Sequence, residues 1–125
     1  MATITVHLPA DASLVRVARL VAASAARRAG LGEEAVDDVR LAVGEACAWA
    51  VVRHQRVAAE APVELVLDDS TPARLTLEVL DHGGPGRAED SDDLGLALLR
   101  GLAGEVGLEP TADGARLRFS LPGPA

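Results

Sequence analysis

The alternation of apolar and polar residues predicts five strands and three helices, in the order β-α-α-β-β-α-β-β. Ile4, Val6 and Leu8 show the pattern at its simplest, since polar residues separate them and Pro9 ends the run. The order favours an α+β fold, a two-layer α/β sandwich with a mixed, mostly antiparallel sheet and helices on one face. The expected strands are 4–8, 63–67, 75–80, 105–108 and 115–121, and the expected helices are 14–29, 33–54 and 94–102.

Signals at the ends of the first helix support its predicted boundaries. Asp11 or Ser13 can cap its start, and Gly30 and Gly32 follow its last turn. The residues of this helix that recur at helical spacing are expected to face the core. This stripe consists of Leu14, Val17, Ala18, Val21, Ala22 and Ala25.

The second helix contains the most informative stretch of the chain. Only Gly44 and Glu45 interrupt the apolar run 41–52, which predicts a helix buried nearly all round. A carboxylate there is costly unless it is paired or solvated in a cavity, and the alternative to a site is a structural carboxylate held by backbone or by an arginine. Trp49 follows one turn later on the same face and is expected to wall or fill the same pocket. His54 is expected to be solvated and to complement the helix dipole.

Composition limits the possible classes of protein. The 125 residues, 49% hydrophobic and 25% charged, indicate one globular domain over 1–125. A net charge of -7 argues against nucleic-acid binding. Cys47 is the only cysteine, so no intramolecular disulfide is possible, and it is expected in the core. No cluster of His, Cys and Asp has metal-ligand spacing, so no metal site is predicted.

Neither a targeting segment nor a membrane-spanning segment is expected in this sequence. Residues 1–8 lack the charged and apolar regions of a signal peptide. No window reaches the roughly 18 to 20 apolar residues that a membrane span requires. A soluble, cytoplasmic protein without membrane partners is therefore expected.

Three motifs lie in a fixed order along the chain. Glu45-Ala46 is followed by Trp49-Ala50 on the second helix, and Asp81-His82-Gly83 ends a strand with Gly84-Pro85-Gly86 behind it. Gly95-Leu96 then opens the third helix. In order and in place they resemble the small ATP-binding anti-sigma factors with serine-kinase activity, which belong to the GHKL (Bergerat-fold, histidine-kinase-like) ATPase superfamily. The resemblance extends from the first strand to Phe119.

The resemblance implies a nucleotide site with two departures from the family pattern. It assigns Glu45 as the base that activates the attacking hydroxyl, and it places Trp49 where the family has an Mg²⁺-binding asparagine. An indole offers one N–H donor and no acceptor, and its size can fill nucleotide space. Asp93 stands at a phosphate-facing glycine position, where it adds negative charge. ATP and Mg²⁺ binding are therefore expected to be weakened or lost, and whether the protein is an enzyme stays open.

The remaining site residues follow from the same resemblance. It assigns Asp81 to the adenine amino group, although Asp-x-Gly after a strand is also an ordinary turn. It places Gly83, Gly86 and Gly95 around the nucleotide, together with Trp49. Gly95 would lie at a helix start, where backbone N–H groups meet phosphate.

The resemblance also implies protein partners. In that family the first helix contacts a sigma factor or a STAS-domain anti-anti-sigma protein, and Arg16 stands where a partner-binding arginine is common. We therefore expect an anti-sigma-factor-like regulator of transcription. The alternatives are an active Mg·ATP-dependent serine/threonine kinase of the STAS antagonist, or a structural subunit that keeps only the fold. A homodimer can also form if the first strand lies at a sheet edge.

Overall fold

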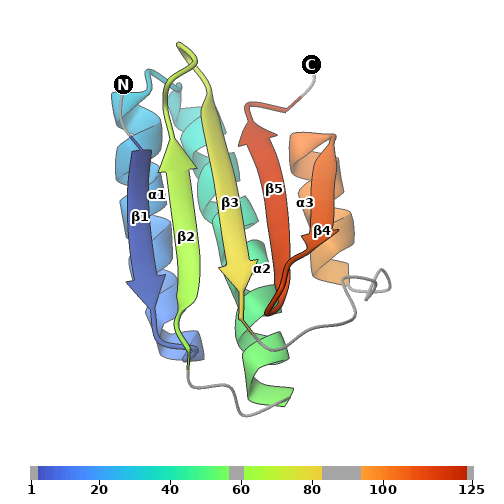
Figure 1. Ribbon diagram of the computed structural model, residues 1–125. Helices are drawn as coiled ribbons and strands as arrows, with labels where there is room; N and C mark the ends of the chain where they lie inside the picture. Colours follow the sequence, from blue (N-terminus) through green and yellow to red (C-terminus); the bar gives the residue numbers. More distant parts are fainter. Residues whose placement is uncertain (1–2, 57–60, 83–93, 124–125) are drawn as a thin grey trace.

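A five-stranded sheet forms one layer of the molecule, and three helices cover one of its faces (Figure 1). The computed structural model describes residues 3–56, 61–82 and 94–123. The strand order is β1-β2-β3-β5-β4, and every described pair is antiparallel, so the sheet is not mixed as expected. The elements are β1 (Thr3–Leu8), η1 (Ala12–Leu14), α1 (Val15–Arg28), α2 (Glu33–Arg56), β2 (Val63–Asp68), β3 (Leu75–Asp81), α3 (Leu94–Ala103), β4 (Val106–Pro110) and β5 (Ala115–Leu121).

The predicted two-layer α+β sandwich and its elements are confirmed, with boundaries that agree within two residues. Asp11 accepts a hydrogen bond of 2.9 Å from the backbone N–H of Ser13 and caps the short η1 turn that precedes α1. Gly30 has a φ of +88° after the last turn of α1, a backbone conformation that favours glycine. None of the described helices is long and apolar enough to cross a membrane.

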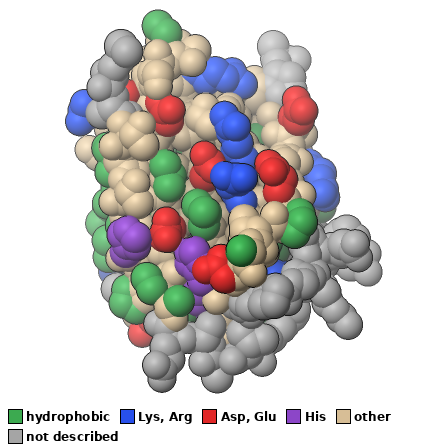
Figure 2. All heavy atoms as spheres, viewed as in Figure 1, with side chains coloured by type: hydrophobic (Ala, Val, Ile, Leu, Met, Phe, Trp, Pro, Cys, Tyr) green, Lys and Arg blue, Asp and Glu red, His purple; other side chains and the backbone are tan. Residues whose placement is uncertain are grey.

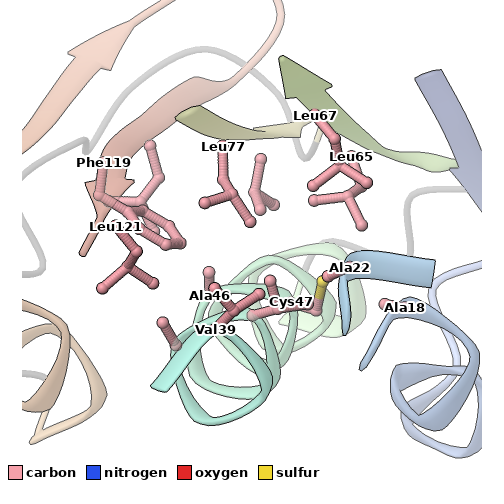
Figure 3. Close-up of a cluster of buried hydrophobic side chains, with 14 of the residues drawn as sticks. Ala18, Ala22, Val39, Ala46, Cys47, Leu65, Leu67, Leu77, Phe119 and Leu121 are labelled. Carbon is pink, nitrogen blue, oxygen red and sulfur yellow. The ribbon is translucent and has the colours of Figure 1, made fainter. Parts of the chain in front are cut away.

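In the core, large side chains of the sheet face helices that contribute many alanines together with some larger side chains such as Val39 and Leu99 (Figure 3). Alternate residues of the central strands are buried: Val63, Leu65, Leu67, Leu75, Leu77, Val79, Leu117, Phe119 and Leu121. The helices oppose them with buried alanines: Ala18, Ala22, Ala25, Ala26, Ala42, Ala46 and Ala50. Each buried leucine contributes about 2 kcal/mol. Alanine on the facing helices lets the two layers approach closely, and Cys47 is buried among these residues as predicted.

The predicted core stripe of α1 is wrong at Val17, which is 41% exposed. The helix packs against α2 as well as against the sheet. Its buried face is therefore rotated toward Ala23 and Ala26, which the stripe did not include.

The prediction that α2 is buried nearly all round is also wrong. Leu41 and Val52 are each 45% exposed, and Ala48 is exposed between them. In a two-layer sandwich every helix keeps an outer face in solvent. Glu45 lies beside this outer face and is half-buried.

Overpacking the interface between the layers should destabilise the fold. Ala46 of α2 points toward the sheet and is fully buried, so Ala46→Leu forces extra atoms into a filled space (Figure 3). We expect a loss of about 1–3 kcal/mol in the free energy of unfolding, measured by urea denaturation. Ala48→Leu on the exposed face of the same helix is the control and should change stability by less than about 0.5 kcal/mol. Equal losses in the two variants would contradict this account of the packing.

Candidate functional site

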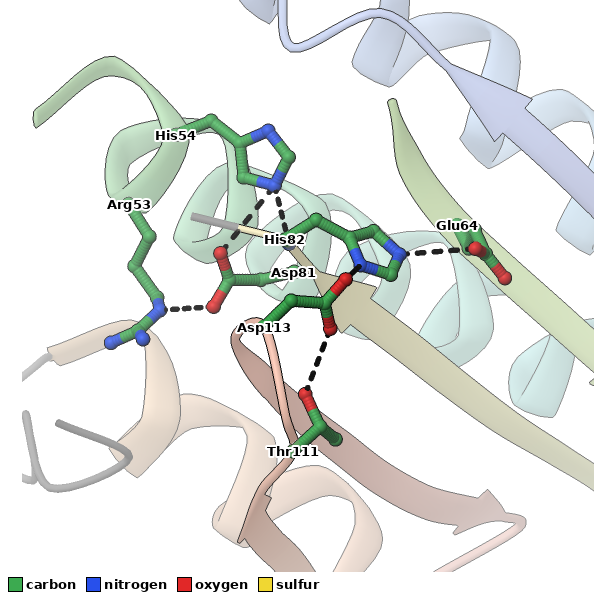
Figure 4. A network of polar contacts seen from close by, with 7 residues as sticks. All are labelled: Arg53, His54, Glu64, Asp81, His82, Thr111 and Asp113. Carbon is green, nitrogen blue, oxygen red and sulfur yellow. Dashed lines mark hydrogen bonds and ion pairs between the residues drawn. The ribbon is translucent and has the colours of Figure 1, made fainter. Parts of the chain in front are cut away.

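A network of buried polar side chains lies where the second half of α2 meets the end of β3 (Figure 4). Asp81, the last residue of β3, is fully buried. Arg53 of α2 donates from Nε to Asp81 Oδ2 at 2.5 Å, and His54 Nε2 lies 3.4 Å from Asp81 Oδ1. A buried carboxylate without a cation partner would be strongly destabilising. The Arg53 guanidinium is therefore what keeps this charge inside the fold.

Trp49 packs against the same Arg53 guanidinium. The Arg53 guanidinium carbon is 5.2 Å from the centroid of the Trp49 ring, within the range of a cation–π interaction. The indole is only 4% exposed, and its Nε1 has no hydrogen-bond partner among the described residues. Glu45, Trp49 and Arg53 recur every four residues and share one stripe of α2. Indole, guanidinium and carboxylate are thus placed in series from α2 to β3.

His54 is fully buried, so its predicted solvated position is wrong. It follows Ala50 by one turn on the side of α2 that faces the sheet, and α2 continues beyond it to Arg56. The backbone N–H of His82 donates to His54 Nε2 at 2.7 Å. This nitrogen therefore carries no proton, and the imidazole is the neutral form protonated on Nδ1. Burial lowers the pKa of His54 more than the nearby Asp81 charge raises it.

His82 links three parts of the sheet through its side chain (Figure 4). Its Nδ1 lies 2.8 Å from Asp113 Oδ2, in the turn before β5, and its Nε2 lies 3.0 Å from Glu64 Oε1 on β2. A neutral imidazole has one N–H, so two facing carboxylates favour the doubly protonated cation. Partial burial lowers the pKa of His82, but the hydrogen bonds to Asp113 and Glu64 outweigh it and leave the pKa above its ordinary value.

Gly114 allows the turn between β4 and β5 to lie against the end of β3. A Cβ atom at this position would overlap the backbone carbonyl of Asp81. The turn closes with a hydrogen bond of 2.9 Å from Thr111 N–H to the Gly114 carbonyl. It places Asp113 beside His82, so this turn also helps to build the network.

The structure brings some of the sequence-predicted residues together. Trp49 and Asp81 are connected through Arg53, and Glu45 lies one turn before Trp49, half-buried and without a polar partner among the described residues. Gly95 lies in the first turn of α3, which packs against α2. Of the remaining predicted residues, Arg16 is exposed on α1, away from this network, and Gly83, Gly86 and Asp93 lie outside the described residues.

Trp49, which the motif resemblance places at a metal-binding position, does not suit a hard cation such as Mg²⁺. Mg²⁺ binds oxygen ligands, whereas Trp49 has no oxygen to offer. The Arg53 cation next to its ring adds repulsion. Within residues 3–56, 61–82 and 94–123, no group of His, Cys, Asp and Glu side chains could hold a metal ion.

Sequence reasoning missed Arg53, His82, Glu64 and Gly114. A signal existed for Arg53, since it continues the spacing of four residues from Glu45 through Trp49. His82 stands within the Asp81-His82-Gly83 motif, but nothing in the motif indicates its contacts. These contacts, and those of Glu64 and Gly114, arise only through the pairing of strands that are distant in sequence.

Comparison with known proteins finds a family and a structural neighbour. Residues 8–121 match the family described as the histidine kinase-like ATPase domain. Among solved structures, this chain is similar to a crystal structure of the RsbU and RsbW domains of Rv1364c from Mycobacterium tuberculosis, with a TM-score of 0.75 and 17% sequence identity. This match covers 96% of this chain and 31% of that chain, and at such identity it supports the fold alone. None of the curated proteins matches the chain.

The two histidines should give the stability of the protein a maximum near their ordinary pKa of 6.5. Below this pH the unfolded chain protonates His54 while the folded chain resists, so stability falls as the pH decreases. Above it, folded His82 keeps the proton that the unfolded chain releases, so stability falls as the pH rises through the folded pKa. Urea denaturation between about pH 5.5 and 8 measures both effects.

The variant His82→Gln separates the two histidines. It should abolish the loss of stability above pH 6.5 and leave the loss below it unchanged. The exposed side chain of His7 forms no hydrogen bond or ion pair among the described residues, so His7→Gln is the control and should keep the wild-type pH profile. If stability still falls above pH 6.5 in His82→Gln, the hydrogen bonds of His82 to Glu64 and Asp113 are not the cause of that loss.

Proposed function

Because this chain belongs to the histidine kinase-like ATPase domain family, we propose that it is an anti-sigma-factor-like regulator whose nucleotide site is filled by its own side chains. It controls transcription by binding a sigma factor, a STAS-domain anti-anti-sigma factor, or both, and it binds ATP weakly or not at all. The observation that carries this proposal is the buried pair of Arg53 and Asp81.

Asp81 matches the aspartate that accepts a hydrogen bond from the adenine amino group in the GHKL family. Adenine recognition needs a carboxylate oxygen that the exocyclic amino group can reach. The Asp81 carboxylate has no exposed surface, and its Oδ2 accepts from Arg53. Exposing it to the base would disturb a buried ion pair at a cost of several kcal/mol, which one neutral hydrogen bond would not recover. The pair therefore acts against nucleotide binding.

Trp49 acts against phosphate and metal binding in the same site. It replaces the asparagine that would hold Mg²⁺, and the buried indole takes up space beside α2. Without a metal ligand the charge that develops in phosphoryl transfer loses its main stabilisation. These arguments support a protein that acts through its surface.

The first helix is the surface that we assign to partner binding. α1 carries four arginines and no acidic residue, in a chain whose net charge is -7. Arg16 is exposed, and no described carboxylate pairs with it. Val17 and Leu20 lie exposed beside it. A cation next to apolar side chains fits the role that the family resemblance implies for Arg16.

The second candidate function is the Mg·ATP-dependent kinase that phosphorylates a serine or threonine of its STAS-domain antagonist. Glu45 favours it, because a partly exposed carboxylate with no polar partner among the described residues is available to act as a base. The kinase requires nucleotide binding beside Glu45. The two functions are therefore separated by measuring ATP affinity and then phosphate transfer.

Titration with Mg·ATP should show no saturable binding up to about 1 mM, where a Kd would correspond to about -4.1 kcal/mol. Trp49 fluorescence reports from the disputed position, since it is the only tryptophan, and calorimetry excludes absorbance artefacts. The double variant Trp49→Asn/Arg53→Ala frees both positions and should gain measurable affinity by calorimetry. It also removes the cation partner of buried Asp81 and so lowers stability, and thermal unfolding must show that it is folded at the temperature of the titration. The matched control Trp49→Phe/Arg53→Ala frees Asp81 but supplies no metal ligand, and it should gain less.

Two results would contradict the binding-module proposal. One is micromolar ATP affinity of the wild-type protein. The other is phosphate transferred to a STAS-domain partner and lost in Glu45→Ala. Circular dichroism of each variant shows whether lost binding reflects lost folding.

Partner binding should depend on Arg16. We expect Arg16→Glu to weaken binding to the cognate sigma factor or STAS-domain protein by about tenfold or more, because it reverses an exposed charge at the contact. Arg100→Glu makes the same change on the exposed face of α3 and should leave affinity unchanged. Calorimetry with both candidate partners from the same genome measures the effect. Equal affinity of the wild type and Arg16→Glu would show that this surface of α1 is not part of the interface.

A further inference from the structure

A hollow lies over β4 and β5, on the face of the sheet that the helices leave uncovered. It has a volume of about 330 Å³, at the lower end for pockets that bind small molecules. Figure 2 shows basic and acidic side chains gathered on this face of the molecule. The residues that line the hollow include Arg74, Glu105, Gly107, Glu109, Arg118 and Ser120. A small charged molecule is therefore the kind of ligand to consider.

The missing side chain of Gly107 leaves this space open. In the sheet Gly107 pairs with Arg118 of β5, and Glu105 and Glu109 stand two residues away on either side of it. The backbone does not require glycine here, because the φ of Gly107 is not in the left-handed region. An added Cβ atom would lie 3.9 Å from the Arg118 carbonyl oxygen, an ordinary contact. Glycine weakens a strand, and one that the backbone does not need often marks the approach of a ligand.

Two exposed arginines of the hollow have no carboxylate partner among the described residues. Arg118 forms no ion pair there. Arg74 donates from Nη1 to the Pro122 carbonyl at 3.2 Å, which positions the guanidinium without neutralising its charge. Ala73, just before it, has a φ of +55°, and its N–H donates to the Ala29 carbonyl at 3.1 Å. Such a conformation is costly for alanine, and strain of this kind is concentrated at functional sites.

One carboxylate of the hollow is also unpaired. Arg116, the neighbouring arginine of β5, lies 3.6 Å from Glu109 and 3.7 Å from Glu78, so it compensates the charge of Glu109. Glu105 is exposed and forms no ion pair in the part of the chain that the structure describes. The hollow thus presents two unpaired cations and one unpaired anion. A complementary ligand carries two negative groups and one positive group.

We propose that the hollow over Gly107 binds a small acidic amino acid, with the chemistry of glutamate or aspartate. The two carboxylates of the ligand accept hydrogen bonds from Arg74 and Arg118, and its ammonium group lies beside Glu105. A phosphate dianion fits less well, because Glu105 and Glu109 line the same hollow and repel it. The site lies on the opposite face of the sheet from the helices, so it does not rest on the function proposed above.

Titration of the full, 15N-labelled chain with L-glutamate tests the proposal. Amide chemical shifts should change along β4 and β5 and at residues 71–74, and should saturate with a Kd of about 1 mM or below. Low ionic strength is needed because salt screens exposed charges. Glutarate lacks the ammonium group and glutamine lacks one carboxylate, so each should bind about tenfold more weakly.

Variants of the hollow locate the binding. Gly107→Leu fills the space and should abolish binding, while the protein stays folded because the added atoms lie on the solvent face of the sheet. Gly101→Leu adds the same side chain at an exposed position of α3 and is the control. Arg118→Gln should weaken binding about tenfold, whereas Arg100→Gln on α3 should leave it unchanged. Thermal unfolding checks that each variant is folded.

The role of Glu105 has its own test. Glu105→Gln should weaken the binding of glutamate to the level of glutarate, because it removes the partner of the ammonium group. It should not weaken the binding of glutarate, which has no such group. A merely structural role of Glu105 would weaken both ligands equally.

Three results would overturn the proposal. They are the absence of saturable shifts up to about 10 mM glutamate, binding of glutarate as tight as that of glutamate, and binding that persists in Gly107→Leu. Because none of these measurements involves ATP, a sigma factor or a STAS-domain protein, their failure is distinguishable from failure of the proposed function.

Discussion

The charge of Asp81 is the constraint on which this end of the molecule depends. A carboxylate with no exposed surface must be matched by a cation within hydrogen-bonding distance. Arg53 supplies that cation, and the Trp49 ring packs against its guanidinium. His54 stays neutral because it accepts a hydrogen bond from the residue after Asp81. Loosening any one of these contacts would leave a buried charge or a buried donor unmatched.

The packing of the two layers sets up this arrangement. Alanines on α2 let the helix lie close to the leucines of β3 and β5, and this fixes which turn of α2 reaches the end of β3. The turn that does so carries Arg53 and His54. On the other side of β3, Gly114 lets the last hairpin approach the Asp81 backbone closely. The polar network is thus held by apolar contacts that lie mostly outside it.

The family fold and the chemistry of the site can be considered separately. Residues 8–121 match a histidine kinase-like ATPase domain, and the three helices cover the sheet on one side. The other face of the sheet carries side chains of both charges, including the ion pairs of Arg116 with Glu78 and Glu109 (Figure 2). At the site, the carboxylate of Asp81 is paired with Arg53 within the protein. The fold alone does not determine the chemistry of such a site.

The sequence by itself determined the elements, their order and the one-sided sandwich, because alternation and helical spacing record which residues are buried. It also indicated that Glu45, Trp49 and Asp81 belong to one end of the molecule, through their order in a resembled motif. It did not determine how each helix is rotated in the assembled fold, so Val17 was placed in the core and His54 in solvent, both wrongly.

Only the tertiary structure decided the partners of the buried charges. Arg53 and Asp81 are 28 residues apart, and His82 and Asp113 are 31 residues apart. Periodicity describes neighbours within one helix or strand, whereas these contacts arise from the packing of α2 on β3 and from the pairing of β3 with β5. Burying an unpaired charge is costly, so the fold must bring a cation to Asp81. Which cation lies close enough is known only once the helix is packed on the sheet.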